Sequence, residues 1–310
     1  MYLTARQLTL FVAPLLAAAA IGGFLLGNRR GQAAPLEQAL PARQANIALE
    51  YPSTWQPVRS APPIPGLSIA HPLLLAPGGD ATRAGLLGGQ LAPGQPGPLP
   101  ASFVALMTEL PRTEVVDFLG VEAYSYSHVR LPAYERLLDL YVIPSAAGPP
   151  TAIACYASQG SSSYLRGCEQ IVATLTPVGH SGYDLNPSAP YSSRLGAVTG
   201  ELDRERLIIR RQMGVVRAPS AVAGLATTLG ERFATAAAAI RAIRPPAAAA
   251  AAQAALVASM ERADESYRAL ATAAPSAAAS VAVAQAHVGS AEAGVDSALG
   301  TFALLGYKHT

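Results

Sequence analysis

Residues 115–143 read VVDFLGVEAYSYSHVRLPAYERLLDLYVI, and residues 151–158 read TAIACYAS. Both stretches are rich in β-branched and aromatic residues, and Gly and Pro interrupt the chain where turns are expected. Side chains alternate strictly over residues 121–130, which is typical of a strand with two different faces. We therefore predict an antiparallel β-meander with strands at residues 115–118, 121–130, 135–143 and 151–158.

Helices and further strands are predicted on either side of this meander. After it, residues 161–175 place apolar side chains on one helical face: Leu165, Cys168, Ile171, Val172 and Leu175. Before it, residues 99–110 predict a helix that ends at a proline. Short apolar runs bounded by Gly and Pro predict strands at residues 47–51, 66–70 and 83–91.

Residues 191–307 have the period of a helix instead of a strand. Apolar residues recur at steps of three and four in four segments separated by proline. Alanine at many of these positions lets helix axes approach closely, so we predict an up-and-down four-helix bundle. A membrane span is the alternative for residues 276–307, but His287, Glu292 and Asp296 would be costly inside lipid.

The segment at residues 8–27 reads LTLFVAPLLAAAAIGGFLLG; it carries no charge and has the length that crosses a bilayer core. We predict that it is an uncleaved transmembrane anchor. A cleaved signal peptide is the alternative, but its apolar region is normally shorter, and Arg29 and Arg30 precede any small-residue cleavage site. Residues 28–44 lack β character and are predicted to be a polar tether.

The chain has two cysteines, Cys155 and Cys168, and both fall in the same predicted domain. An even pair within one domain is typical of a disulfide formed in an oxidising compartment, and two buried free thiols are the alternative. Arginines flank both ends of residues 8–27, so charge does not decide the orientation of the anchor. The cysteine pair favours a single-pass membrane protein with the bulk of the chain extracytoplasmic.

Two short segments connect this order of elements with a known family. They are YPSTW at residues 51–55, after the first strand, and CEQIVATL at residues 168–175, at the end of the last helix. With the elements between them, residues 45–178 resemble the Mog1/PsbP-like fold. The resemblance implies an antiparallel sheet with helices packed on one face, and a binding or accessory role more often than catalysis.

The predicted fold class is therefore α+β: an N-terminal transmembrane helix, a Mog1/PsbP-like antiparallel sheet with packed helices, and an all-α up-and-down bundle. The predicted parts are an N-terminal flank (1–7), the anchor (8–27), a linker (28–44), the α/β domain (45–178), a second linker (179–190), the Ala-rich bundle (191–307) and a tail (308–310).

The sequence offers one candidate ligand-binding surface. It contains no nucleophile elbow, phosphate loop or zinc-protease motif, and its five histidines lack metal-ligand spacing, so no catalytic residue, metal or cofactor is predicted. Alternation along the strand at 121–130 places Tyr124, Tyr126, His128 and Arg130 on one face, where they could bind a glycan, a peptide or a small anion. The alternative is that the rings pack in the core.

Three functions remain open. A net charge of +2 without a basic run argues against nucleic acid, and the arginine-rich, Ala-, Gly- and Pro-rich composition is typical of a GC-rich bacterium. We predict a non-enzymatic envelope adaptor, anchored through residues 8–27, whose bundle binds a protein partner or a second copy. An enzyme acting on envelope glycan or lipid would instead need a titratable pair in a cleft, such as Glu122 with Glu135 or His128 with Asp139. A self-associating structural stalk is the third hypothesis.

Overall fold

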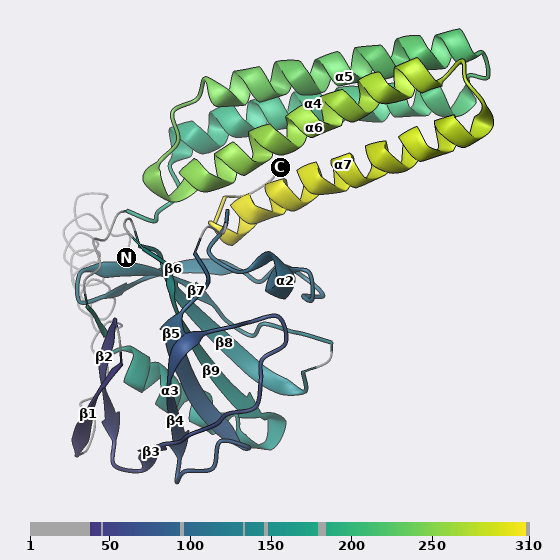
Figure 1. Ribbon diagram of the computed structural model, residues 1–310. Helices are drawn as coiled ribbons and strands as arrows, with labels where there is room; N and C mark the ends of the chain where they lie inside the picture. Colours follow the sequence, from purple (N-terminus) through teal and green to yellow (C-terminus); the bar gives the residue numbers. More distant parts are fainter. Residues whose placement is uncertain are drawn as a thin grey trace, which may run out of the picture.

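The computed structural model describes residues 38–44, 46–93, 96–132, 134–145, 148–178 and 184–307. The anchor predicted at residues 8–27 lies outside these ranges. Among the helices within them, none combines the length and apolar composition that a bilayer crossing requires. The described chain is α+β, with antiparallel sheets, packed helices and a helical C-terminal region, as predicted (Figure 1).

Two antiparallel sheets make up the α/β part. The strands of the large sheet are β3 (Trp55–Pro57), β4 (Ala70–Pro77), β5 (Ala84–Gln90), β6 (Thr113–Phe118), β7 (Val121–Tyr126), β8 (Arg136–Ile143) and β9 (Thr151–Ser158). Their spatial order is β3-β4-β5-β9-β8-β7-β6, so the predicted β-meander is confirmed as four consecutive neighbours from β6 to β9. The small sheet contains β1 (Ala39–Gln44), β2 (Ile47–Pro52) and β10 (Thr176–Pro177), with β2 in the middle.

Alternation along the strands gives the large sheet two apolar faces. In β8, Leu138 and Leu140 join one hydrophobic core, whereas Tyr141 and Ile143 join the other. The first face is covered by the short helix α2 (Ala101–Val104) and by the helical bundle, and the second by α3 (Ser163–Val172) and β2. The central strands are therefore buried on both sides, which explains their almost continuous apolar sequence.

The predicted disulfide is present and joins the sheet to the helix that covers it. Cys155 on β9 and Cys168 on α3 are bonded, with their Cα atoms 5.9 Å apart. A 3-10 turn, η2 (Gln159–Ser161), reverses the chain between these two elements. The face of α3 that packs on the sheet consists of the predicted residues Leu165, Cys168, Ile171 and Val172.

Several boundaries differ from the prediction, among them those of β1, β4 and α2. Residues 39–44, assigned to a tether without β character, form β1 and pair antiparallel with β2. Their side chains are mostly exposed, so the strand is held by backbone hydrogen bonds and leaves no apolar alternation in the sequence. The strand β4 lies at residues 70–77 rather than 66–70, and α2 covers only four residues of the helix predicted at 99–110. Leu106 and Leu110 are exposed, so no packing holds further turns of α2.

Four long helices form the described C-terminal region, where a four-helix bundle was predicted. They are α4 (Ala189–Val215), α5 (Pro219–Arg241), α6 (Ala250–Ala273) and α7 (Ala278–Leu304), with a 3-10 turn, η3 (Ala247–Ala249), before α6. The hydroxyl of Ser188 accepts a hydrogen bond from the backbone N–H of Tyr191 at the start of α4. Pro219 occupies the first position of α5, where no intrahelical N–H is needed.

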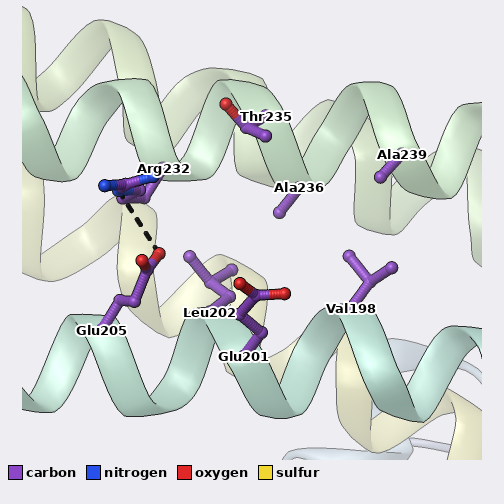
Figure 2. A pocket seen from close by; sticks show the side chains of 8 residues that line it. All are labelled: Val198, Glu201, Leu202, Glu205, Arg232, Thr235, Ala236 and Ala239. Carbon is purple, nitrogen blue, oxygen red and sulfur yellow. Dashed lines mark ion pairs between the residues drawn. The ribbon is translucent and has the colours of Figure 1, made fainter.

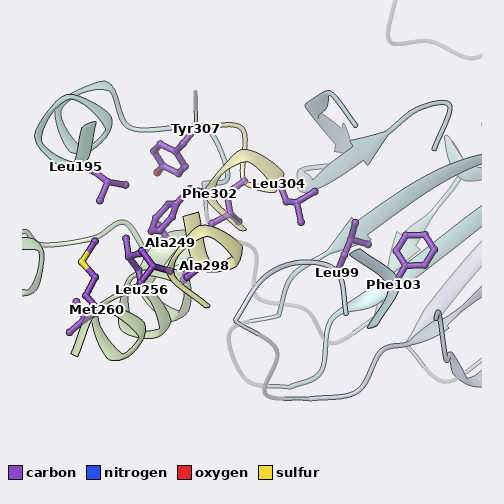
Figure 3. Packing of buried hydrophobic residues seen from close by; sticks show 14 of the residues in the cluster. Leu99, Phe103, Leu195, Ala249, Leu256, Met260, Ala298, Phe302, Leu304 and Tyr307 are labelled. Carbon is purple, nitrogen blue, oxygen red and sulfur yellow. The ribbon is translucent and has the colours of Figure 1, made fainter. Parts of the chain in front are cut away.

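The bundle and the large sheet share one hydrophobic core, and the C-terminal end of α7 makes the connection. The hydroxyl of Tyr126 on β7 donates to the carbonyl of Leu304 at 2.7 Å, and the hydroxyl of Thr113 on β6 donates to the carbonyl of Ala303 at 3.0 Å. Figure 3 shows Leu304 on the side of the bundle that faces Leu99 and the α2 region. The rings that close this end of the bundle are Tyr191, Phe302 and Tyr307.

Candidate functional site

The four residues of the predicted ligand patch do not share a surface. Tyr124 and Tyr126 are 1% and 0% exposed and lie in the core between the sheet and the bundle. Burial, with a smaller contribution from Tyr124, raises the pKa of Tyr126 well above its ordinary value, so this hydroxyl acts as a neutral hydrogen-bond donor. His128 and Arg130 are exposed and lie beyond the end of β7, which stops at Tyr126 instead of continuing to Arg130.

The end of β7 has a local cause at His128. Its backbone φ is +56°, in the left-handed region that breaks strand geometry. The carboxylate of Asp139, which is buried, accepts a hydrogen bond from the backbone N–H of His128 at 2.6 Å and so holds this bend. The bend ends the alternation on which the predicted patch depended.

The carboxylates proposed for an enzyme hold backbone and neighbouring side chains. Glu122 accepts hydrogen bonds from the N–H of Leu185 at 2.6 Å and from the side-chain amide of Asn186 at 2.9 Å, and it thereby ties the segment before α4 to β7. Its proposed partner Glu135 is exposed, and the carboxylate of Asp139 accepts a hydrogen bond from the backbone N–H of His128. Within the ranges that the structure describes, no group of three or more His, Cys, Asp or Glu residues could hold a metal ion.

A cavity of about 460 Å³ lies where α2 and the loop before it face α6 and α7. This volume falls in the range of sites for small organic ligands. We call it the interdomain cavity. Its lining residues are Pro96, Gly97, Leu99, Ala101, Val104 and Ala105 on the α/β side, Ala255, Ala258, Ser259 and Arg262 on α6, and Gly294, Ser297, Ala298, Thr301 and Leu304 on α7.

The sequence creates this space by placing small residues on both helical faces. The lining residues of α6 recur at steps of three, one and three, and those of α7 recur at steps of three, one, three and three, so each set occupies one face. Most are Gly, Ala or Ser, which cannot reach across to the other domain. The two sides approach each other at the rim instead, where a Cβ on Gly97 would lie 2.7 Å from Cγ2 of Thr301, so a larger residue at position 97 would force Thr301 or the loop to shift.

Arg262 supplies the charge of the interdomain cavity. Its guanidinium donates to the hydroxyl of the buried Ser259 at 2.8 Å, whereas Arg262 itself is exposed, which places the cation at the mouth of the cavity. Across the described ranges, none of the ion pairs involves Arg262. The arrangement combines an apolar wall with one cation that is available to an anion.

Two other cavities are less suited to a ligand. One of about 210 Å³ lies across the loop at residues 96–98 and has Tyr124 in its wall. Another of about 110 Å³ lies between α4 and α5, where Glu205 and Arg232 form an ion pair at 3.4 Å (Figure 2). That space has room for a few water molecules only, and an ion pair so accessible to solvent contributes little to stability.

A buried ionic network in the bundle was not foreseen from the sequence. Glu292 on α7 is 4% exposed, and its carboxylate accepts from Arg206 and Arg210 of α4, each at 3.0 Å, and from the hydroxyl of Tyr267 on α6 at 2.7 Å. Arg206 also pairs with Asp296 at 2.8 Å. The network therefore joins α4, α6 and α7 through a single carboxylate.

Glu169 on α3, next to the disulfide-bonded Cys168, is affected by the charge of a second acid, Asp139. Partial burial, followed by the charge of Asp139, raises the pKa of Glu169 above its ordinary value, while His128 and Arg166 oppose the shift. This carboxylate is thus less stable in its charged form than one in free solution.

Comparisons with known proteins yield only distant structural similarity. No family model matches the chain, and no curated protein matches it. Among solved structures, it is similar to the cyanobacterial PsbP (CyanoP) of Synechocystis sp. PCC 6803, with 11% sequence identity and a TM-score of 0.30. The similarity covers 47% of this chain and 96% of that chain. It is too distant to carry a conclusion about function.

Proposed function

We propose that this chain is a non-enzymatic, membrane-anchored binding or adaptor protein of the bacterial envelope, with its folded part outside the cytoplasm. The bond between Cys155 and Cys168 is the observation that carries the proposal. Structural disulfides persist in oxidising compartments and are rare in the cytosol. The uncharged segment at residues 8–27 supplies an anchor of suitable length.

The binding role is supported by how the chain uses its polar groups. The carboxylates of Glu122, Asp139 and Glu292 are each occupied by hydrogen bonds that hold the fold. The interdomain cavity, by contrast, combines apolar walls with one unpaired cation, which suits recognition of a ligand better than acid–base chemistry on it.

Thiol labelling in spheroplasts that express the full chain tests the location. An impermeant maleimide should label Cys155 and Cys168 only after reduction and denaturation, because the two residues are bonded to each other and their side chains are buried. As a positive control, Val283→Cys places a thiol on an exposed position of α7, in a chain where both native cysteines are serine. This thiol should react in intact spheroplasts without reduction. If it reacts only after lysis, the folded part is cytoplasmic and the proposal fails.

Self-association is a second candidate, because α4 presents large apolar side chains to solvent. Leu207 and Ile208 are more than half exposed, and the exposed Val215 lies about two turns further along α4. Light scattering of the full chain in detergent should then give a dimer that Ile208→Ser converts to a monomer.

A further inference from the structure

We propose that the interdomain cavity binds a single-chain amphipathic anion, with the apolar chain between α2 and the α6–α7 face and the anionic head at Arg262. This inference rests on the proposed function and deepens it, because it names the ligand class of the binding protein. A carboxylate and a phosphate monoester share the required chemistry. A fatty acid or the headgroup of a single-chain phospholipid would supply it.

The shape of the cavity favours a chain over a compact molecule. Its lining on α6 runs from Ala255 to Arg262, and its lining on α7 from Gly294 to Leu304. At 1.5 Å of rise per residue, these stretches are about 10 Å and about 15 Å long. The space therefore extends along the two helices, with Arg262 at the end of the α6 stretch.

The chemistry of the walls favours an alkyl chain. Leu99 and Val104 on the α/β side and Leu304 on α7 contribute aliphatic surface, and the remaining positions are mostly Ala, Gly and Pro. Aliphatic surface removed from water on binding stabilises the complex in proportion to its area. The hydroxyls of Ser259 and Thr301 are engaged by Arg262 and by the α7 backbone, so they do not call for a polar ligand body.

The charge at the mouth favours an anion. Arg262 is fixed in direction by its hydrogen bond to Ser259, which leaves the other guanidinium N–H groups to a ligand. A planar guanidinium matches a carboxylate or phosphate with two parallel hydrogen bonds. The neighbouring acid on α6, Glu261, pairs with Arg241 of α5 on another side of the helix.

The test uses the full chain in phosphatidylcholine nanodiscs and a dodecanoate that carries a photoreactive diazirine at its chain end. Cross-linked residues would be mapped by mass spectrometry. We expect labels in residues 96–105, 255–262 and 294–304. Unlabelled dodecanoate and dodecyl phosphate should compete, and whichever competes at the lower concentration identifies the source as a free fatty acid or a phosphate headgroup. Each pair of methylenes removed should weaken competition about tenfold.

Matched variants locate the ligand. Ala258→Leu fills the cavity from α6 and should reduce labelling at least tenfold, whereas Ala254→Leu, on an exposed position of the same helix, should leave it unchanged. Arg262→Met should weaken competition by dodecanoate about tenfold and leave competition by dodecanol unaltered. Arg211→Met, a similar change on an exposed position of α4, serves as its control.

Three results would overturn the inference. They are labels outside the cavity, equal labelling in the Ala254 and Ala258 variants, or equal competition by dodecanol and dodecanoate in the unmodified chain. Circular dichroism would show whether the variants are folded. If Ala258→Leu does not fold, Ser297→Leu replaces it, because that substitution fills the cavity from α7. Because the thiol-labelling experiment involves no ligand, a failure here leaves its outcome unaffected, and the two proposals can fail separately.

Discussion

Neutralising Glu292 should destabilise the helical bundle more than any exposed charge change. In Glu292→Gln the side chain keeps its shape but loses the negative charge that accepts hydrogen bonds from Arg206, Arg210 and Tyr267. An amide has one acceptor oxygen in place of two, and its NH₂ group must face at least one of these three donors. Arg206 would retain only Asp296, whose side chain is more than half exposed.

The expected cost follows from burial. Breaking a buried ion pair by removing one partner costs roughly 3–5 kcal/mol when the remaining charge is left uncompensated. The charge of Arg206 would still be compensated in part by Asp296. The side chain of Arg210 is largely exposed, so solvent screens its charge and its contribution to the cost is small. We therefore expect a loss of about 2–3 kcal/mol in the free energy of unfolding. Tyr267→Phe, which removes one donor only, should cost about 1 kcal/mol.

Urea unfolding of the full chain in a mild detergent, followed by far-UV circular dichroism, measures this difference. The sheet and the bundle share a core, so we expect one transition, and its midpoint should fall by about 1 M in Glu292→Gln. The matched control is Glu201→Gln, an exposed acid on α4, which should change stability by less than about 0.5 kcal/mol. Equal midpoints for the two variants would refute the view that the buried network stabilises the bundle.

Three further outcomes are expected from the same unfolding assay. Replacing both Cys155 and Cys168 by serine should cost roughly 3 kcal/mol, because the bond closes a short loop of the unfolded chain, and a reducing agent should then have no additional effect. The raised pKa of Glu169 means that the folded state holds its proton more tightly than the unfolded state. The stabilisation from this group is therefore present at low pH and is lost as pH rises above the ordinary glutamate range. Glu169→Gln should remove that pH dependence and should be more stable than the unmodified chain at pH 7. Tyr126→Phe should cost about 1 kcal/mol by removing the hydrogen bond to Leu304, and an unchanged midpoint would show that this contact does not help to join the sheet to the bundle.

Patterns of burial were predictable from the sequence, whereas backbone pairing and bends were not. The apolar run in residues 151–158 and the helical period of residues 161–175 both reflect side chains that enter a core, and both elements are present. The strand β1 buries almost nothing and left no pattern. The left-handed residue His128 ended β7 early because the carboxylate of Asp139, eleven positions later, holds it, and no local rule reports such a contact.

The candidate site could be predicted even less, because it lies between elements that are far apart in the chain. Small residues at Ala255, Ala258 and Ser259 look like close helix–helix packing when read along one helix. Only the fold shows that this face looks toward α2 across a space. The available signal was Arg262, a charge on an otherwise small-residue face, whose meaning depends on what lies opposite.

The interdomain cavity has a consequence for stability that separates a ligand site from a packing defect. An aliphatic side chain at position 258 would enter space that is now empty and would bury additional apolar surface. Ala258→Leu should therefore raise the free energy of unfolding by up to about 1 kcal/mol, and with it the urea midpoint, while it abolishes binding. Bound dodecanoate should raise the midpoint of the unmodified chain by mass action and leave that of the variant unchanged. A stabilised variant that still responds to dodecanoate would place the ligand elsewhere. A destabilised variant would mean that the space is too small to admit three more heavy atoms, let alone an alkyl chain, and the assignment of this cavity would have to be abandoned.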